Sequence, residues 1–278
     1  MGMWALDFKG MKLLDHPKLV SPILIAGWPG MGLVAYKSVS YLIENLGAKP
    51  LAQFDLQDLY QIRGISVNQG MVEKIDLPSG RAYHHTPSGS KKSLILFLGD
   101  EQPVAGKELL VSRELLQMAS DLGCIEVFTF AAMVTGISHH AVPKVWGCTT
   151  LPAMLEKMKS HDILPMSDGQ ISGLNGLLVG IASSYGMTAS CLLGELPYYA
   201  TQIAYYPASS AVLEKFAVLS GLVLDLDSLR DQGKTTQIEI DTYIEHIKRD
   251  ALRKKEEPQE PEEVSEPVKP DDDEDIMN

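Results

Sequence analysis

The chain has 278 residues, of which 45% are hydrophobic and 22% charged, the composition of a folded protein with a large apolar core. Most of its net charge of −12 is at one end: residues 256–278 hold 11 acids and one base, which leaves 25 acids and 23 bases for the first 255 residues. A body with a net charge of only −2 argues against nucleic-acid binding, which would need a basic surface.

The first ten residues show no basic segment followed by an apolar run, and the longest apolar stretches are shorter than a membrane span. We therefore expect a cytoplasmic protein that does not enter a membrane. Three cysteines are spaced too widely for a metal knuckle, and their apolar surroundings predict buried free thiols rather than disulfides. These are Cys124, Cys148 and Cys191.

The first elements predict a parallel strand–helix–strand unit. Residues 22–26 form a short apolar run typical of a buried parallel strand, and apolar residues spaced near 3.6 predict a helix over 33–46. The next strand is expected at residues 51–55, and a right-handed crossover follows from this order. Residues 60–83 mix short apolar runs with glycine turns, which predicts an antiparallel excursion of short strands.

The rest of the chain alternates strands and helices, with one helix, over residues 174–184, apolar nearly all round. We expect that helix to lie deep in the fold or against a partner. The same periodicities predict strands at 93–98, 125–131, 145–149 and 187–193, and helices at 107–122, 151–159, 174–184, 209–220, 225–230 and 238–255.

This order predicts an α/β fold, a three-layer α/β/α sandwich with a mixed, mostly parallel sheet. We expect a single domain over residues 1–255 whose C-terminal part, 209–255, is helical. Residues 256–278 alternate proline with acidic residues and contain few aliphatic ones, so we expect a disordered acidic tail.

A glycine-rich turn joins the first strand to the first helix: Gly27, Gly30 and Gly32. Backbone amides at such a position could bind an anion. The spacing is not that of a dinucleotide or P-loop motif, however, and Pro29 removes one amide. The other interpretation is a tight turn in which glycine permits close packing.

Asp100 and Glu101 follow the most apolar strand, at the edge where open α/β sheets bind ligands. Two carboxylates at this position could bind a metal or act as a base. Adjacent side chains point in different directions, however, and Pro103 with Gly106 indicates capping of the next helix instead.

A second glycine-containing turn opens the apolar helix. Ser172 or Asn175 could cap that helix, and with Gly176 these residues could form a second anion site. The structural interpretation is a cap together with a glycine that lets the helix pack closely.

Neighbouring histidines occur at His84–His85 and His139–His140, without the spacing of metal ligands, so we expect exposed loop histidines and no metal site. No nucleophile elbow is present, and Ser138 is adjacent in sequence to His139, a poor geometry for a catalytic pair. No residue is singled out as catalytic and no cofactor is expected; the sequence favours binding, although it leaves an enzyme open.

Four segments together resemble the proteasome assembly chaperone 2 family, including its archaeal and bacterial members. They occur in the family's order, and with the connecting elements the resemblance covers about Pro22 to Arg230. They are Pro22–Val34, Leu94–Pro103, Gln170–Val179 and Cys191–Pro197.

The resemblance implies a three-layer fold like that of nucleoside phosphorylases and self-association, often into trimers. It also implies a proteasome-like partner, since eukaryotic and some archaeal relatives bind proteasome α-rings. Several of these relatives end in a hydrophobic residue, a tyrosine and any residue, whereas this chain has Met277 at the tyrosine position.

Two hypotheses follow. The first is a chaperone-like protein that acts by protein–protein binding. The alternative is a hydrolase or binding protein for a small nucleoside- or nucleotide-type molecule, which would use the turns at residues 27–32 and 172–176. Self-association is also predicted from the apolar helix at 174–184 and from four tyrosines, since aromatic residues are enriched at interfaces. These are Tyr198, Tyr199, Tyr205 and Tyr206.

Overall fold

The structure, a computed structural model, describes residues 10–56, 59–60, 64–74, 77–87, 89 and 91–256, with only the backbone for 252–256. The chain divides into two compact units, Met1–Ile238 and Glu239–Asn278. Most of the predicted acidic tail, residues 257–278, lies outside the described residues, and the single domain over 1–255 stays a prediction.

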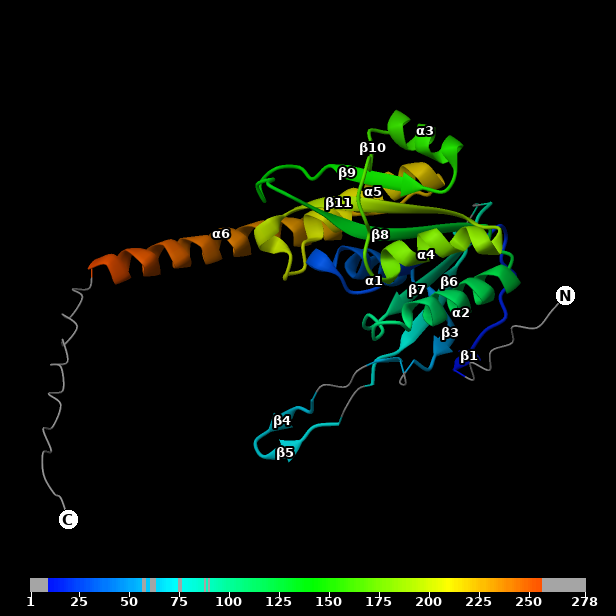
Figure 1. The fold of residues 1–278 in the computed structure, drawn as a ribbon, viewed down its shortest axis with the longest axis horizontal. Coiled ribbons are helices and arrows are strands. Elements are labelled where there is room, and N and C mark those ends of the chain that lie inside the picture. The colour runs from blue at the N-terminus through cyan, green and yellow to red at the C-terminus, as the bar shows by residue number, and fades with distance from the viewer. Residues whose placement is uncertain are drawn as a thin grey trace, which may run out of the picture. The chain divides into compact units, whose positions relative to one another are not determined.

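A nine-stranded mixed sheet is the centre of the first unit (Figure 1). Its four middle strands, β7, β2, β8 and β11, run parallel, and antiparallel pairs lie on both sides of them. The predicted α/β fold with a mixed, mostly parallel sheet is confirmed. In sheet order the strands are β1 (Met11–Leu13), β3 (Lys49–Phe54), β6 (Gly80–His85), β7 (Leu94–Gly99), β2 (Ile23–Gly27), β8 (Glu126–Thr135), β11 (Thr188–Pro197), β9 (Val145–Thr149) and β10 (Leu164–Pro165).

Helices cover both faces of this sheet, which gives the three layers: α2 and α4 pack on one face, and α1 and α5 on the other (Figure 1). The helices are α1 (Val34–Asn45), α2 (Glu108–Asp121), α3 (Pro152–Ser160), α4 (Leu174–Ala182), α5 (Tyr206–Ser220) and α6 (Asp227–Glu256), with short 3-10 turns η1 (Met31–Leu33), η3 (Ser183–Tyr185) and η4 (Tyr198–Ala200).

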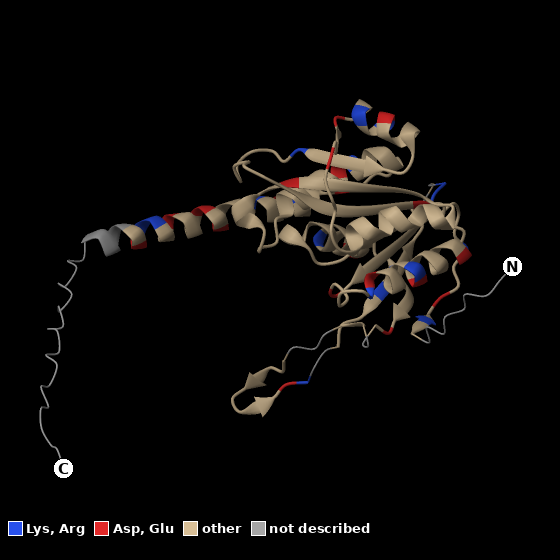
Figure 2. Ribbon diagram, viewed as in Figure 1, with Lys and Arg blue, Asp and Glu red and all other residues tan. Residues whose placement is uncertain are grey.

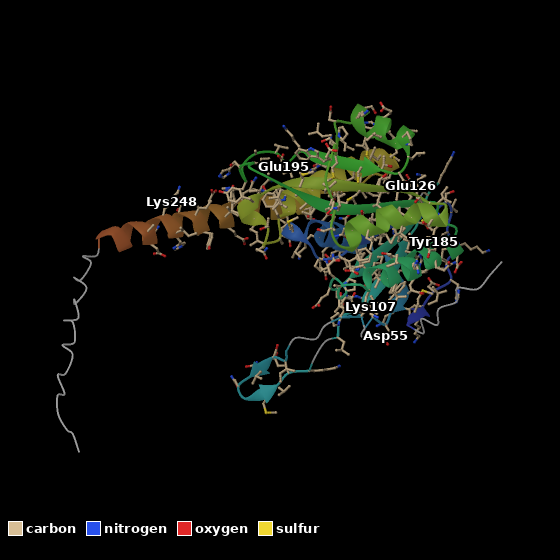
Figure 3. The ribbon with its side chains drawn as sticks, viewed as in Figure 1. Asp55, Lys107, Glu126, Tyr185, Glu195 and Lys248 are labelled. Atoms are coloured by element: carbon tan, nitrogen blue, oxygen red, sulfur yellow. The ribbon has the colours of Figure 1, made fainter. Side chains whose placement is uncertain are left out.

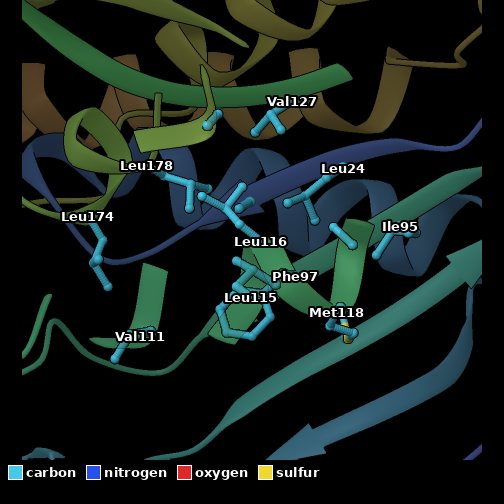
Figure 4. Packing of buried hydrophobic residues seen from close by; sticks show 14 of the residues in the cluster. Leu24, Ile95, Phe97, Val111, Leu115, Leu116, Met118, Val127, Leu174 and Leu178 are labelled. Atoms are coloured by element: carbon cyan, nitrogen blue, oxygen red, sulfur yellow. The ribbon is translucent and has the colours of Figure 1, made fainter. Parts of the chain in front are cut away.

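Successive side chains of β8 point to opposite faces of the sheet, which shows why the sheet needs a helical layer on each face. Val127 belongs to the core under α2 and α4, whereas the ring of the next residue, Phe128, lies 5.1 Å from that of Phe216 on α5. In the first core, Leu115 and Leu116 of α2 are fully buried with residues of β2, β7 and α4 (Figure 4). Each such leucine stabilises the fold by about 1.5–3 kcal/mol.

The predicted strand–helix–strand unit forms, but its two strands are not neighbours. Two strands, β6 and β7, lie between β3 and β2 in the sheet. The predicted antiparallel excursion is confirmed: it includes β6 and a separate two-stranded hairpin of β4 (Val67–Asn68) and β5 (Met71–Val72).

The apolar helix α4 lies deep in the fold, packed on α2, β8 and β11, as predicted. The two predicted C-terminal helices, 225–230 and 238–255, are instead one helix, α6. Gly233 does not interrupt it, because a single glycine costs a helix only about 1 kcal/mol and no proline lies between the two segments. Charges of both signs line α6 and are sparse over the sheet (Figure 2).

Within the described residues, none of the helices combines the length and the apolar character needed to cross a membrane.

Candidate functional site

Three loops meet at the carboxyl edge of the parallel strands, the edge at which open α/β sheets bind their ligands. The first, residues 28–33, follows β2; the second, 100–107, follows β7; the third, 168–173, precedes α4. The sequence-predicted glycines and carboxylates lie in or beside these loops, so the structure brings the predicted site residues to one edge.

Asn175 joins the third loop to the first. Its side-chain Nδ2 donates to the carbonyl oxygen of Trp28 at 3.2 Å, and its Oδ1 accepts from the backbone N–H of Trp28 at 3.1 Å. Both residues are buried, and the carbonyl oxygen of Asn175 accepts a further hydrogen bond from the Thr129 hydroxyl of β8. The prediction that Asn175 or Ser172 caps α4 is wrong: the N-cap residue is Gly173, and no side chain of this segment bonds there.

Gln102, which the sequence did not single out, links all three loops. Its Nε2 donates to the carbonyl oxygen of Pro29 at 2.9 Å, and its Oε1 accepts from the backbone N–H of Leu174 at 3.0 Å. An amide from another element thus caps α4. In the sequence, Gln102 could have been found from its position directly after Asp100 and Glu101, where only the two carboxylates were considered as candidate ligands.

The glycines of the first loop have different reasons for being glycine. A Cβ at Gly27 would lie 2.7 Å from the carbonyl oxygen of Ala35 and 2.8 Å from a methyl carbon of Val39, so Gly27 lets α1 pack against β2. Gly32 has a φ of +62°, a conformation that favours glycine. A Cβ at Gly30 would meet only the Asn175 side chain, at 3.8 Å. Close packing, the structural interpretation, thus accounts for Gly27.

The carboxylate of Asp100 is engaged with β6 and its preceding residue. It accepts hydrogen bonds from the N–H and hydroxyl of Ser79 and pairs with Arg81 at 2.6 Å. The predicted capping of the next helix is wrong, because α2 begins after Lys107 without a side-chain cap. Glu101 is exposed to solvent. Asp100 thus fastens the end of β7 to β6.

Gly176 of α4 has a packing role, because the absence of a Cβ there lets residue 171 pack closely on the helix.

The histidines differ from the expectation of exposed loop residues. His84 and His85 lie within β6, and the His84 ring pairs with Asp15 at 2.9 Å. His139 is buried; its Nδ1 lies 2.8 Å from the Tyr199 hydroxyl. Glu195 lies near the end of β11 (Figure 3). Its carboxylate accepts hydrogen bonds from the Thr135 hydroxyl and from the backbone N–H of residue 144. These groups fasten the loop after β8.

The cysteines are free, as predicted; Cys124 and Cys191 are buried as expected, whereas Cys148 is only partly buried. Burial raises the pKa of Cys191 to about 12 and also raises the pKa values of Cys124 and Cys148. Since the thiolate is the reactive form, none of the three has the character of a nucleophile at neutral pH.

A cleft of about 310 Å³ opens where the three loops meet. Among the described residues that line it none is charged, and the side-chain amides of Gln102 and Asn175 are already engaged with other loops. Its lining consists of Pro29, Gly30, Met31, Ala35, Gln102, Ala131, Ala132, Gln170, Ile171, Ser172, Gly173, Asn175 and Leu193.

Exposed apolar residues continue from the cleft onto the loop after β11. The backbone N–H of Gly32 donates to the carbonyl oxygen of Thr201 at 2.8 Å, which ties this loop to the first one. We call four exposed side chains the rim; Tyr198 is the most exposed of them, at 68%. The rim consists of Met31, Tyr198, Tyr199 and Ile203.

The cleft and rim offer shape, apolar surface and backbone polar groups, but no charged acid or base among the described lining residues. Of the four tyrosines predicted at an interface, Tyr205 is fully buried and Tyr206 partly so, which leaves Tyr198 and Tyr199 for contact. An uncharged surface with exposed aromatic residues is suited to recognising another protein.

Comparison with known proteins identifies relatives of this chain. A family model described as the PAC2 family matches residues 24–244. An uncharacterised protein of Methanocaldococcus jannaschii is 27% identical over 240 residues, which cover 86% of this chain and 87% of that protein.

Among solved structures, PbaB of Pyrococcus furiosus, described as an archaeal proteasome activator, is 26% identical. The match covers 84% of this chain and 98% of PbaB, with a TM-score of 0.70. A Mycobacterium tuberculosis proteasome-assembly chaperone homologue, 20% identical, shares the fold with a TM-score of 0.67 over 80% of this chain and 94% of its own.

Proposed function

The chain belongs to the PAC2 family, and from this premise we propose that it is a chaperone-like protein that acts by binding other proteins, with a proteasome-like particle as a partner. The observation that carries the proposal is the cleft, whose buried amides hold loops together and whose rim exposes aromatic side chains. The relatives described as a proteasome activator and an assembly-chaperone homologue support the choice of partner.

The rim would supply the contact energy. Tyrosine side chains bury large areas with little loss of conformational freedom, and a few such residues dominate the affinity of most interfaces. The cleft beside them would accept one partner side chain, held by backbone groups of loops that are already fixed. Fixed loops lose little entropy on binding, which favours affinity.

The small-molecule alternative has less support. An anionic nucleotide would need cations or free amides, whereas the described lining carries no charge and its buried side-chain amides are paired.

The test is binding of the full chain to a purified archaeal proteasome, measured with the particle immobilised. We expect saturable binding at micromolar concentrations or below. No binding at these concentrations, or a source genome without proteasome genes, would reject this partner.

Self-association, with the trimer as the state implied by the resemblance, is the second part of the proposal. The apolar helix α4 no longer supports it, because α4 is used in the core. Its support now comes from apolar residues exposed outside the sheet, among them Val67 and Val72 of the hairpin.

A further inference from the structure

Cys148 and Cys191 are directly opposite each other on neighbouring strands. In the antiparallel pair of β9 and β11, Cys148 is the register partner of Cys191 (Figure 1). Residues opposite each other in such a pair point to the same face of the sheet. The packing agrees, since Cys191 belongs to the core under α2 and α4 and Cys148 packs against that core. The two thiols, 43 positions apart in the sequence, are therefore neighbours in the fold.

The separation of the two residues is suited to a disulfide. Directly opposite residues of antiparallel strands have Cα atoms about 4.5–5.5 Å apart, and the Cα atoms of disulfides lie about 4.4–6.8 Å apart. The Cβ atoms of such a pair are about 4.5–5.5 Å apart, compared with about 3.5–4.5 Å in a disulfide. Closing the bond therefore requires one strand to move by up to about 1 Å.

The strand that carries Cys148 lies close to one edge of the sheet, where such a movement is easiest. Only β10 lies beyond β9, and its register covers Trp146 and Gly147 but not Cys148. Segments near the edge of a fold open at a lower free energy than strands in the core. Both thiols are free in the structure; Cys148 is partly buried, so a small reagent can reach it, whereas Cys191 is buried.

Each of the two residues affects the ionisation of the other, which agrees with their proximity. Burial raises the pKa of Cys148, and a hydrogen bond from the backbone of Cys191 acts in the opposite direction. Burial also raises the pKa of Cys191; the side chain of Thr129 opposes this rise, and the charge of the Cys148 thiolate adds to it. Since the thiolate is the attacking species, exchange at this pair is slow at neutral pH and becomes faster as the pH rises.

The third cysteine, Cys124, has a different environment. It precedes β8 and is not part of the described strand pairs, and its thiol donates a hydrogen bond to the carbonyl oxygen of Glu126 at 3.2 Å. In an unfolded chain, however, Cys124 would be the preferred partner of Cys148, because the two are only 24 positions apart and closing a shorter loop costs less entropy. The fold and the sequence therefore favour different cysteine pairs.

We propose that Cys148 and Cys191 form a modification site, a dithiol that a small disulfide such as oxidised glutathione converts into an intramolecular disulfide. The Cys148 thiolate attacks the reagent, which forms a mixed disulfide and releases one glutathione thiolate. Cys191 then loses its proton and displaces the second glutathione from Cys148. One S–S bond breaks and one forms: the two protein thiols are oxidised, and two molecules of reduced glutathione carry away the two protons. The strain of bringing the Cβ atoms together makes this bond readily reducible.

Oxidation of the full chain in its folded and unfolded states tests the site. The protein is incubated with oxidised glutathione at about pH 9, where more thiolate is present, both without and with urea. Remaining thiols are then alkylated, and mass spectrometry of the intact chain and of its peptides identifies the linked cysteines. We expect the folded protein to lose two hydrogens and to yield only the Cys148–Cys191 linkage. In urea, the Cys124–Cys148 linkage should prevail among the internal disulfides.

Alanine substitutions separate the pair from the third cysteine. Cys124→Ala should leave the internal disulfide of the folded protein unchanged, whereas Cys148→Ala should abolish it. Cys191→Ala should also abolish it and leave a glutathione adduct on Cys148; circular dichroism checks that each variant is folded, and the peptide map of the wild type does not depend on them.

Three results for the folded wild type would overturn the site. They are a glutathione adduct that persists on Cys148, any linkage to Cys124, and the absence of an internal disulfide after a time in which the sample in urea is fully oxidised. The site is independent of the proposed function, so none of these results bears on proteasome binding.

Discussion

The side-chain amide of Asn175 pairs with both backbone polar groups of Trp28, 147 positions away in the chain, and so fixes the first loop of the cleft to α4. Both residues are buried, so water cannot readily replace the two hydrogen bonds. The amide therefore acts within the fold, and the cleft is shaped before any partner arrives.

Replacing Asn175 by alanine should destabilise the protein by about 2–4 kcal/mol, since each buried polar group left unpaired costs about 1–3 kcal/mol. The control is Gln117→Ala, which removes an exposed amide bonded to Asp121 on α2 and should change stability by less than about 0.5 kcal/mol. Urea unfolding measures both. Equal effects of the two substitutions would contradict the role given to Asn175.

Alanine at two glycines of the same loop should give opposite results. Gly27→Ala forces a Cβ against the backbone of α1 and should cost about 1–3 kcal/mol, whereas the Cβ of Gly30→Ala makes only an ordinary van der Waals contact with Asn175, at 3.8 Å, and should be tolerated. Thermal unfolding of the two variants compares them directly. A stable Gly27→Ala protein would show that α1 can move away from β2 at little cost.

Tyr205→Phe should leave stability unchanged or raise it by up to about 1 kcal/mol at neutral pH, because the buried hydroxyl has no hydrogen-bond partner among the described residues. Burial, and then the charges of Tyr199 and Glu195, raise the pKa of Tyr205 from 10.0 to about 12. The neutral form is thus favoured in the folded state. The contribution of this neutral hydroxyl to the stability of the folded state is complete below pH 10 and is lost as the pH rises through about 12.

Urea unfolding across that interval should therefore show a steeper loss of stability for the wild type than for Tyr205→Phe. Burial also raises the pKa values of Tyr60 and Cys191, so the variant should keep part of the slope. Identical slopes would mean that Tyr205 ionises as easily in the folded chain as in the unfolded one.

The three cysteines should react slowly with a thiol reagent such as an aromatic disulfide near neutral pH. Burial raises the pKa of each thiol, and Cys191, at about 12, should be the slowest. Unfolding in urea should expose all three to rapid labelling. Rapid labelling of Cys191 in the folded protein would contradict its burial between β8 and β9.

The sequence was sufficient for the layers and for the edge at which the loops meet. Apolar runs such as residues 94–98 fix buried strands, and the spacing of residues 34–45 fixes a helix, because burial dictates both patterns. It missed β1 and β10, which have only three and two residues, and their pairing depends on distant strands. Two helices were predicted where α6 is a single helix, because the low helix propensity around Gly233 was given more weight than the continuity of the helix.

The sequence predicted where the candidate site lies but not which interactions its side chains make. Asp100 carries a carboxylate that could bind a ligand, yet in the structure this carboxylate pairs with Arg81. Arg81 lies on a neighbouring strand, and the spacing of the two residues in the sequence does not indicate that they meet. The linking role of Gln102 and Asn175 depends on loops more than 70 positions apart. Which amides remain open to a partner is therefore a property of the fold alone.

The most direct test of the central claim, recognition of a protein through the cleft and rim, is binding of two tyrosine variants to a purified archaeal proteasome. Tyr198 of the rim and Tyr243 of α6 are 68% and 67% exposed. Tyr198→Ala should weaken binding at least about tenfold while Tyr243→Ala leaves it unchanged, since an aromatic side chain that dominates an interface contributes about 2 kcal/mol or more. Unchanged binding by Tyr198→Ala would contradict recognition through the rim.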